Sequence, residues 1–147
     1  MRWRFTDKIT DFEAWKSIRG IKAVSLEEYS LLEWTGRKGS FPENLVVEAC
    51  VHLSRWLVAA SSQFRQSCLL KEIGPFAFTG NTNAGSALFI AIEAQAKADN
   101  ELNVVCDVSG GDRPCGSGKL TLTLVSMREL ICPKDMEALW RELYGKA

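Results

Sequence analysis

The sequence is poor in the residues that build metal sites. Its 147 residues include one histidine, and none of its five cysteines stands in Cys-x-x-Cys spacing with another. Structural zinc sites need about four Cys or His ligands, so this set excludes the usual zinc patterns. We therefore predict no metal and no other cofactor. We expect the cysteines to be reduced thiols, and they are Cys50, Cys68, Cys106, Cys115 and Cys132.

Net charge and long hydrophobic runs are lacking too. Eighteen Lys and Arg residues balance eighteen Asp and Glu residues, so the chain lacks the positive field typical of proteins that bind nucleic acids or anionic membranes. No stretch approaches the ~18 apolar residues of a membrane span, and no apolar run of signal-peptide length follows the basic start of the chain. We expect a cytoplasmic protein that forms a single domain over residues 1–147.

Three segments have the hydrophobic periodicity of helices. They are residues 11–19, 44–64 and 133–144. The first is part of an expected N-terminal helical segment of about 1–20. The second is apolar over most of a helical circumference, which predicts a long central helix nearly surrounded by protein. The third begins at a proline, a residue favoured in the first turn of a helix.

Six further segments are predicted as strands. They are residues 21–26, 29–35, 69–79, 86–98, 102–109 and 119–127. Glycine-rich or polar segments separate them, and residues 110–118 are predicted as a loop. The order of elements fits a curved antiparallel sheet wrapped around one helix better than alternating βαβ units. We therefore predict the α+β class and the hotdog fold, with a core of about 21–129 and a C-terminal helix of about 133–145.

The segment before and inside the predicted central helix resembles a known motif. Residues 39–52 read Gly-Ser-Phe-Pro-Glu-Asn-Leu-Val-Val-Glu-Ala-Cys-Val-His. They resemble the central motif of the 3-hydroxyacyl-acyl-carrier-protein dehydratases, in which a Gly-His-Phe-Pro loop precedes a helix with a Glu-Ala-x-Ala-Gln pattern. The likeness extends over about 21–129. It implies the hotdog fold, a homodimer with paired edge strands, and an acyl thioester of acyl carrier protein or CoA as substrate.

The chain departs from that family at the catalytic position. The family's catalytic histidine aligns with Ser40, and the loop after Phe41 and Pro42 is shorter than the family's. The family's glutamate aligns with Glu48 and its helix glutamine with His52. Since a serine has no proton affinity near neutral pH, Ser40 cannot replace the imidazole as a base. The resemblance therefore implies a divergent dehydratase homologue with weak or no dehydratase activity.

Three functions stay open at this point. The first is a dehydratase, a lyase that acts on 3-hydroxyacyl thioesters in fatty-acid or polyketide-type metabolism. The second is a hotdog thioesterase in which one helix carboxylate activates water or attacks the thioester. The third is a non-catalytic acyl-binding subunit that pairs with itself or with another hotdog subunit. The candidate catalytic residues are Glu48, Ser40 and His52, and the candidate substrate-binding residues are Phe41, Pro42, Arg37 and Lys38.

Each candidate also has a structural explanation. Ser40 and Glu43 match the Ser-x-x-Glu capping box of a helix start. Glu48 can complement the positive end of the helix dipole. His52 follows Glu48 by four residues, so the two side chains can touch on one helix face. Such a pair is either a base with its orienting partner or a satisfied polar contact.

Overall fold

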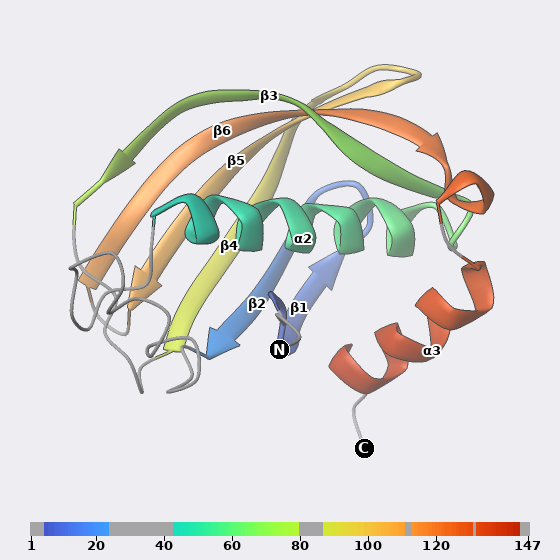
Figure 1. Ribbon diagram of the computed structural model, residues 1–147, viewed down its shortest axis with the longest axis horizontal. Coiled ribbons are helices and arrows are strands. Elements are labelled where there is room, and N and C mark those ends of the chain that lie inside the picture. Colours follow the sequence, from blue (N-terminus) through green and yellow to red (C-terminus); the bar gives the residue numbers. More distant parts are fainter. Residues whose placement is uncertain (1–4, 24–42, 80–86, 111–112, 131, 145–147) are drawn as a thin grey trace.

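The computed structural model describes residues 5–23, 43–79, 87–110, 113–130 and 132–144. The strands in these ranges are β1 (Lys8–Glu13), β2 (Ser17–Ala23), β3 (Gln66–Phe78), β4 (Ala87–Lys97), β5 (Glu101–Gly110) and β6 (Arg113–Ser126). The helical elements are α2 (Glu43–Ser61), the 3-10 turn η2 (Met127–Glu129) and α3 (Pro133–Tyr144). The strands form one antiparallel sheet in the order β1-β2-β4-β5-β6-β3, and this sheet arches over α2 (Figure 1).

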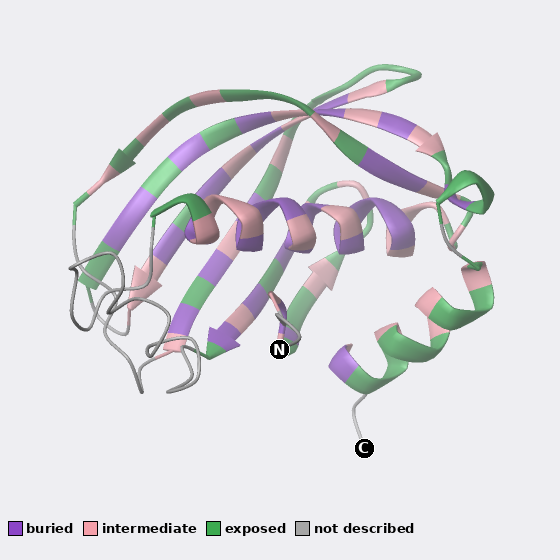
Figure 2. Ribbon diagram, in the orientation of Figure 1, coloured by how far each residue is buried: buried purple, intermediate pink, exposed green. Residues whose placement is uncertain are grey.

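The hydrophobic core lies between the sheet and α2. Buried and exposed residues alternate along β4, β5 and β6 (Figure 2). Every second side chain therefore lies on the side of the sheet that faces α2, here called the inner face, and the others lie on the outer face. Burial stabilises the fold by roughly 1.5–3 kcal/mol for each large aliphatic side chain. The largest fully buried side chains are Ile18, Leu53, Leu57, Leu88, Ile92, Leu102, Leu120, Leu122, Met127, Val51 and Val58.

Residues 11–19 form a β-hairpin, so the predicted N-terminal helix is wrong for this segment. Phe12 of β1 lies opposite Ile18 of β2, and the turn between them passes through Trp15, whose φ is 57°. A spacing of three residues between apolar side chains imitates a helix. Here the spacing arises because the chain reverses direction, which places residues 12 and 18 side by side.

Helix α2 is shorter than the predicted helix and covered less completely. It has 19 residues and spans Glu43–Ser61, whereas the sequence predicts residues 44–64. The helix ends before Gln63 and Phe64, whose φ values of 55° and 62° lie in the left-handed region. The sheet covers one side of α2 (Figure 1), and half-buried polar residues lie on another. The apolar composition of the helix predicts that protein nearly surrounds it. This prediction is wrong for the side of α2 on which the half-buried polar residues lie.

The strand predictions are largely confirmed, with one correction. Strand β6 begins at Arg113, inside the segment 110–118 that is predicted as a loop. The predicted strand at 21–26 overlaps the end of β2, which reaches Ala23. The predicted strand at 29–35 lies outside the described residues.

Helix α3 spans Pro133–Tyr144, as predicted. The ring of Trp140 lies 5.1 Å from Phe12, 6.0 Å from Trp56 and 6.4 Å from Phe64, measured between ring centroids. These contacts dock α3 against β1 and the C-terminal end of α2. Trp56 and Trp140 are therefore packing residues.

Candidate active site

Glu48 and His52 are in contact on α2. They lie one helical turn apart, and the Nε2 atom of His52 is 3.1 Å from the Oε1 atom of Glu48. The exposed fraction is 35% for the His52 side chain and 44% for the Glu48 side chain, so both can be reached from solvent while packing against protein. The contact expected from their spacing is therefore present.

The surroundings of His52 favour the neutral imidazole. Burial lowers the pKa of His52 below its usual value, and the positive charge of Arg55 lowers it further, against an opposite effect of Glu48. The ring of Phe5 stacks on the imidazole, with 4.7 Å between ring centroids and 24° between ring planes. An ionised carboxylate only accepts hydrogen bonds, so a neutral imidazole protonated on Nε2 donates to Glu48. In this protonation state the imidazole of His52 holds the Glu48 carboxylate in place through one hydrogen bond.

Arg55 continues the polar stripe of α2 by one turn. Its Nε atom is buried and has no hydrogen-bond partner among the described residues. Its charge acts on His52 and also on Cys68 at the start of β3, where burial nevertheless raises the pKa of the thiol to about 12. Arg55 therefore adds positive charge between the Glu48–His52 pair and β3.

The buried thiols near α2 are not candidate nucleophiles. Hydrogen bonding with Cys106 and burial raise the pKa of Cys50 well above its usual value, and Cys68 has the raised pKa given above. A thiolate is the reactive form of cysteine, and these two thiols are protonated near neutral pH. The remaining candidates for a nucleophile or base on α2 are therefore the carboxylate of Glu48 and the imidazole of His52.

An apolar strip on β3, formed by Ile73, Phe76 and Phe78, adds a feature that the sequence analysis missed. The rings of Phe76 and Phe78 stack with 5.8 Å between centroids. They lie over Gly118 and Gly116 of β6, where a Cβ atom would meet each ring. The strip occupies the end of β3 nearest the start of α2 (Figure 1), and 52% of Ile73 is exposed.

The sequence contains a pattern that is consistent with this strip. Phe76-Ala-Phe78 and Gly116-Ser-Gly118 are alternating segments on strands that pair with each other. Large rings on one strand need small residues opposite them, because the two side chains share one face of the sheet. Reading residues 110–118 as a loop concealed this match.

An ion pair joins Lys22 on the inner face of β2 to Asp7, which precedes β1. Lys22 is 2% exposed, and its Nζ atom is 3.8 Å from Oδ2 of Asp7. The same carboxylate oxygen accepts a hydrogen bond of 2.8 Å from the backbone N–H of Ala23. These contacts fix the residues that precede β1 against the end of β2.

The remaining candidates lie outside the described residues. They are Ser40, Phe41, Pro42, Arg37 and Lys38. Of the seven candidate site residues, the structure thus places Glu48 and His52. In the described parts of the chain, no group of three or more His, Cys, Asp or Glu side chains is arranged to hold a metal ion.

The described helices include none that is long and apolar enough to cross a membrane.

Comparison with known proteins finds matches among solved structures only. No family model and no curated protein sequence matches the chain. The fluoroacetyl-CoA thioesterase FlK is similar with a TM-score of 0.69 and 14% identity, over 81% of this chain and 92% of FlK. A hot-dog-like protein from Thermanaerovibrio acidaminovorans is similar with a TM-score of 0.67 and 12% identity, over 92% of this chain and 96% of the other.

A third similar structure carries a bound ligand. It is a Streptococcus mutans protein bound to acetyl-CoA, with a TM-score of 0.65 and 12% identity, over 81% of this chain and 88% of the other. At these identities the likeness shows the fold, which is hotdog-like. It does not show the dehydratase family that residues 39–52 resemble.

Proposed function

We propose that this protein hydrolyses acyl thioesters, with Glu48 as its catalytic carboxylate. The observation that carries the proposal is the 3.1 Å contact between Glu48 and His52 on a solvent-accessible part of α2. The fold adds support, because a thioesterase and an acetyl-CoA complex are among the similar structures. Fold alone does not define an activity, so the argument rests on the chemistry of this pair.

Hydrolysis of a thioester needs one group that handles a proton. Glu48, held by the Nε2–H of His52, takes a proton from water as the water oxygen attacks the carbonyl carbon. The carbon–sulfur bond then breaks, and the proton is returned to the departing sulfur. The products are a carboxylic acid and a free thiol. Direct attack by the carboxylate, followed by hydrolysis of the resulting anhydride, uses the same residue and gives the same products.

Dehydration has less support. It requires a base for the proton beside the carbonyl and an acid for the departing hydroxyl. In the family that the sequence resembles, a histidine shares this work, and Ser40 stands at that position here. Hydrolysis of a thioester needs only one carboxylate, and Glu48 can supply it, so this function fits the site better than dehydration does.

The apolar strip on β3 supplies a surface for the acyl group. Its two half-buried rings and the exposed Ile73 face the same side of the sheet as α2. Pockets for acyl groups are mainly apolar, with few polar groups near the reacting atom. We propose that the acyl chain of a CoA thioester lies along this strip while the thioester carbonyl reaches Glu48.

A homodimer completes the proposal. Strand β3 has 13 residues and lies at one edge of the sheet, where no described strand pairs with its outer side. Leu69 and Ile73 on it are 43% and 52% exposed. A long edge strand with exposed apolar residues is a surface for strand pairing. We propose that two copies pair through β3, and we call this assembly the edge dimer.

The test is release of free thiol from a panel of acyl-CoA substrates. The wild type should hydrolyse at least one member, and Glu48→Gln should lose on the order of 10²–10⁴-fold in rate, the usual contribution of a positioned proton carrier. Glu43→Gln is the matched control, because Glu43 is exposed in the first turn of the same helix. Equal rates for Glu48→Gln and the wild type would contradict the proposal. Hydration of crotonyl-CoA without thiol release would favour the dehydratase instead.

A further inference from the structure

The outer face of the sheet contains a cavity that the proposed function does not use. Its volume is about 720 Å³, and its lining runs across the strands from β1 to the residue after β3. The side chains that border it include Arg19 of β2, Phe89 and Ala91 of β4, Asp107 of β5 and Ser117 of β6. Phe89 is 44% exposed, which places a large apolar ring within this lining.

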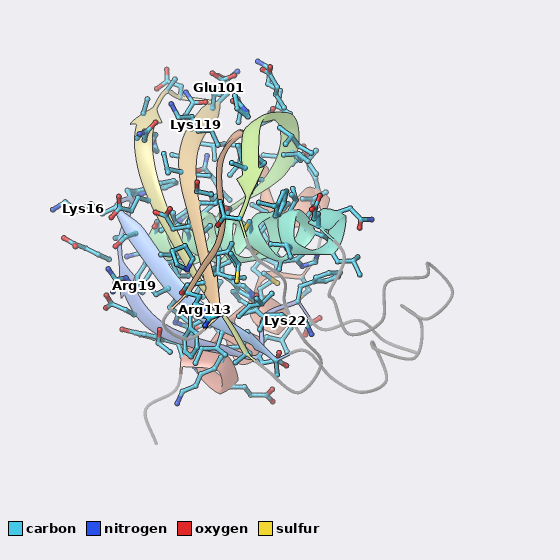
Figure 3. The ribbon with its side chains drawn as sticks, turned by 90° about the vertical axis from the view of Figure 1, so that its left-hand side faces the viewer. Lys16, Arg19, Lys22, Glu101, Arg113 and Lys119 are labelled. Carbon is cyan, nitrogen blue, oxygen red and sulfur yellow. The ribbon has the colours of Figure 1, made fainter. Side chains whose placement is uncertain are left out.

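The strand register arranges two opposite charges symmetrically about β4. Arg19 lies opposite Ala91, and Ala91 lies opposite Asp107. Neighbouring strands are about 4.8 Å apart, so the two charged residues stand roughly 10 Å apart with the small alanine between them. Arg19 projects from β2 away from α2, on the same side as Lys16 (Figure 3).

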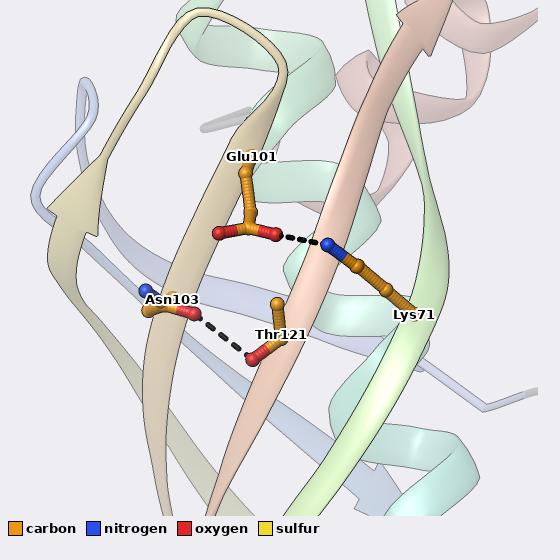
Figure 4. A network of polar contacts seen from close by, with 4 residues as sticks. All are labelled: Lys71, Glu101, Asn103 and Thr121. Atoms are coloured by element: carbon orange, nitrogen blue, oxygen red, sulfur yellow. Dashed lines mark hydrogen bonds and ion pairs between the residues drawn. The ribbon is translucent and has the colours of Figure 1, made fainter.

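These two charges lack the partners that other outer-face charges have. Towards the far end of the sheet, Nζ of Lys71 lies 2.7 Å from Oε1 of Glu101, and Thr121 donates a 2.9 Å hydrogen bond to Asn103 (Figure 4). Neither Arg19 nor Asp107 forms an ion pair with a described residue. Around Phe89, Arg19 and Asp107 are thus available for an ion pair with another molecule, and Asp11 of β1, which lies opposite Arg19 in the register, forms no ion pair with it.

We propose that a second copy of this chain packs on this outer face, sheet against sheet, about a two-fold axis parallel to β4. Rotation about such an axis reverses the order of the strands, so β2 of one copy lies over β5 of the other. Each Arg19 then faces an Asp107, and the contact forms twice. An axis running across the strands through Ala91 would instead place Arg19 against Arg19 and Asp107 against Asp107.

The lengths of the side chains fit this packing. Sheets that stack face to face lie about 10 Å apart. An extended arginine and an aspartate together span about that distance, and so do two phenylalanine rings. The axis places Phe89 against Phe89 of the second copy. In the row of Ala91, two residues along β4, one ion pair lies on each side of the axis. The alanine at 91 leaves room for the arginine stems to cross.

The next row of residues supports the same axis. Glu13, Ser17, Glu93, Val105 and Lys119 lie opposite one another across β1, β2, β4, β5 and β6. Reversal of the strand order places Lys119 over Glu13 of the second copy, which adds a pair of opposite charges. It also places Glu93 over Glu93, so removing this charge should strengthen the association. The effect of removing the charge at position 93 therefore tests whether the axis runs along β4.

The experiment measures the size of the assembly by light scattering across the micromolar range. The wild type is expected to contain four chains, two edge dimers joined through the outer face. Arg19→Asp and Asp107→Arg should each weaken the face contact on the order of tenfold or more, because they bring like charges together. The double variant Arg19→Asp/Asp107→Arg should restore it, and Glu93→Gln should strengthen it. Arg128→Asp, an exposed residue on η2, is the matched control and should leave the assembly unchanged.

Several results would overturn the inference. A wild type that stays monomeric at all concentrations, or a dimer whose size and affinity do not change in Arg19→Asp or Asp107→Arg, would show that no second copy covers this face. A double variant no more associated than the single variants would show that Arg19 and Asp107 do not face each other. Saturable binding of a small aromatic anion to a dimeric wild type, lost in Arg19→Asp, would assign the cavity to a ligand instead. Thiol release from acyl-CoA, measured on the same variants, should not change, so the thioesterase proposal is tested separately.

Discussion

The ring of Phe76 on β3 lies over Gly118 on β6, so closely that a Cβ atom at position 118 would overlap the ring. The neighbouring pair, Phe78 and Gly116, repeats the arrangement two residues further along. Because β3 and β6 are paired over this region, the rings cannot move away without opening the sheet or leaving its inner face. The apolar strip therefore depends on two glycines that belong to another strand.

We expect Gly118→Ala to destabilise the protein by about 1–3 kcal/mol, the usual cost of overpacking. Urea unfolding would measure this change. Phe76→Ala removes the ring, so the double variant Gly118→Ala/Phe76→Ala should be less destabilised than the sum of the single variants. Additive losses would show that the alanine at 118 acts through some effect other than contact with Phe76.

A second prediction concerns a contact that joins the hairpin to α2. The backbone N–H of Trp15 donates a 2.8 Å hydrogen bond to Oγ of Ser61, the last residue of the helix. Ser61→Ala leaves this N–H without its partner and should cost about 0.5–1.5 kcal/mol in urea unfolding. Ser126→Ala, at an exposed position with no side-chain capping bond, is the control and should change stability little. Equal effects of the two variants would mean that the Trp15 contact contributes nothing.

The single histidine makes the pH dependence of stability a clean measurement. The pKa of His52 is lowered in the folded protein, chiefly by burial and then by Arg55. In the unfolded chain a histidine titrates near its ordinary value of about 6.5. As the pH falls below that value, the unfolded state binds the proton first, so the stability due to neutral His52 is lost.

The expected result is a free energy of unfolding that decreases on acidification below about pH 6.5, by at most about 1.4 kcal/mol per pH unit for one proton. His52→Gln should remove this pH dependence of the unfolding free energy at pH values above those at which carboxylates titrate, about pH 4. The NMR signal of the imidazole should report the lowered pKa directly. A histidine pKa above 6.5 would instead indicate that Glu48 dominates over burial and Arg55.

The sequence predicted α3 and most of the sheet because those segments carry local signals. Pro133 marks the start of α3, and Leu120, Leu122 and Leu124 alternate with polar residues in β6. The end of α2 carries no such signal: residues 63 and 64 are left-handed, yet neither is a glycine. The ring of Phe64 packs against Trp140 after this turn, a contact that is remote in sequence.

The candidate site was predictable in part for the same reason. The contact of Glu48 with His52 follows from a four-residue spacing on one helix. The stacking of Phe5 on His52 and the approach of Arg55 to Cys68 join segments that are distant in the sequence or lie on different elements. Periodicity within one element cannot reveal such contacts.

The last prediction tests the edge dimer. Ile73 is the most exposed large hydrophobic residue on β3, and Ile73→Lys places a charge on the edge where the two copies are proposed to pair. A lysine on an edge strand opposes strand pairing, so light scattering should show a smaller assembly. Thiol release should fall as well, because Ile73 also belongs to the apolar strip that is proposed to hold the acyl group. Leu139→Lys on α3, where the leucine is 40% exposed, is the control for an added lysine and should keep the wild-type assembly. An unchanged assembly in Ile73→Lys would place the dimer contact elsewhere than on β3.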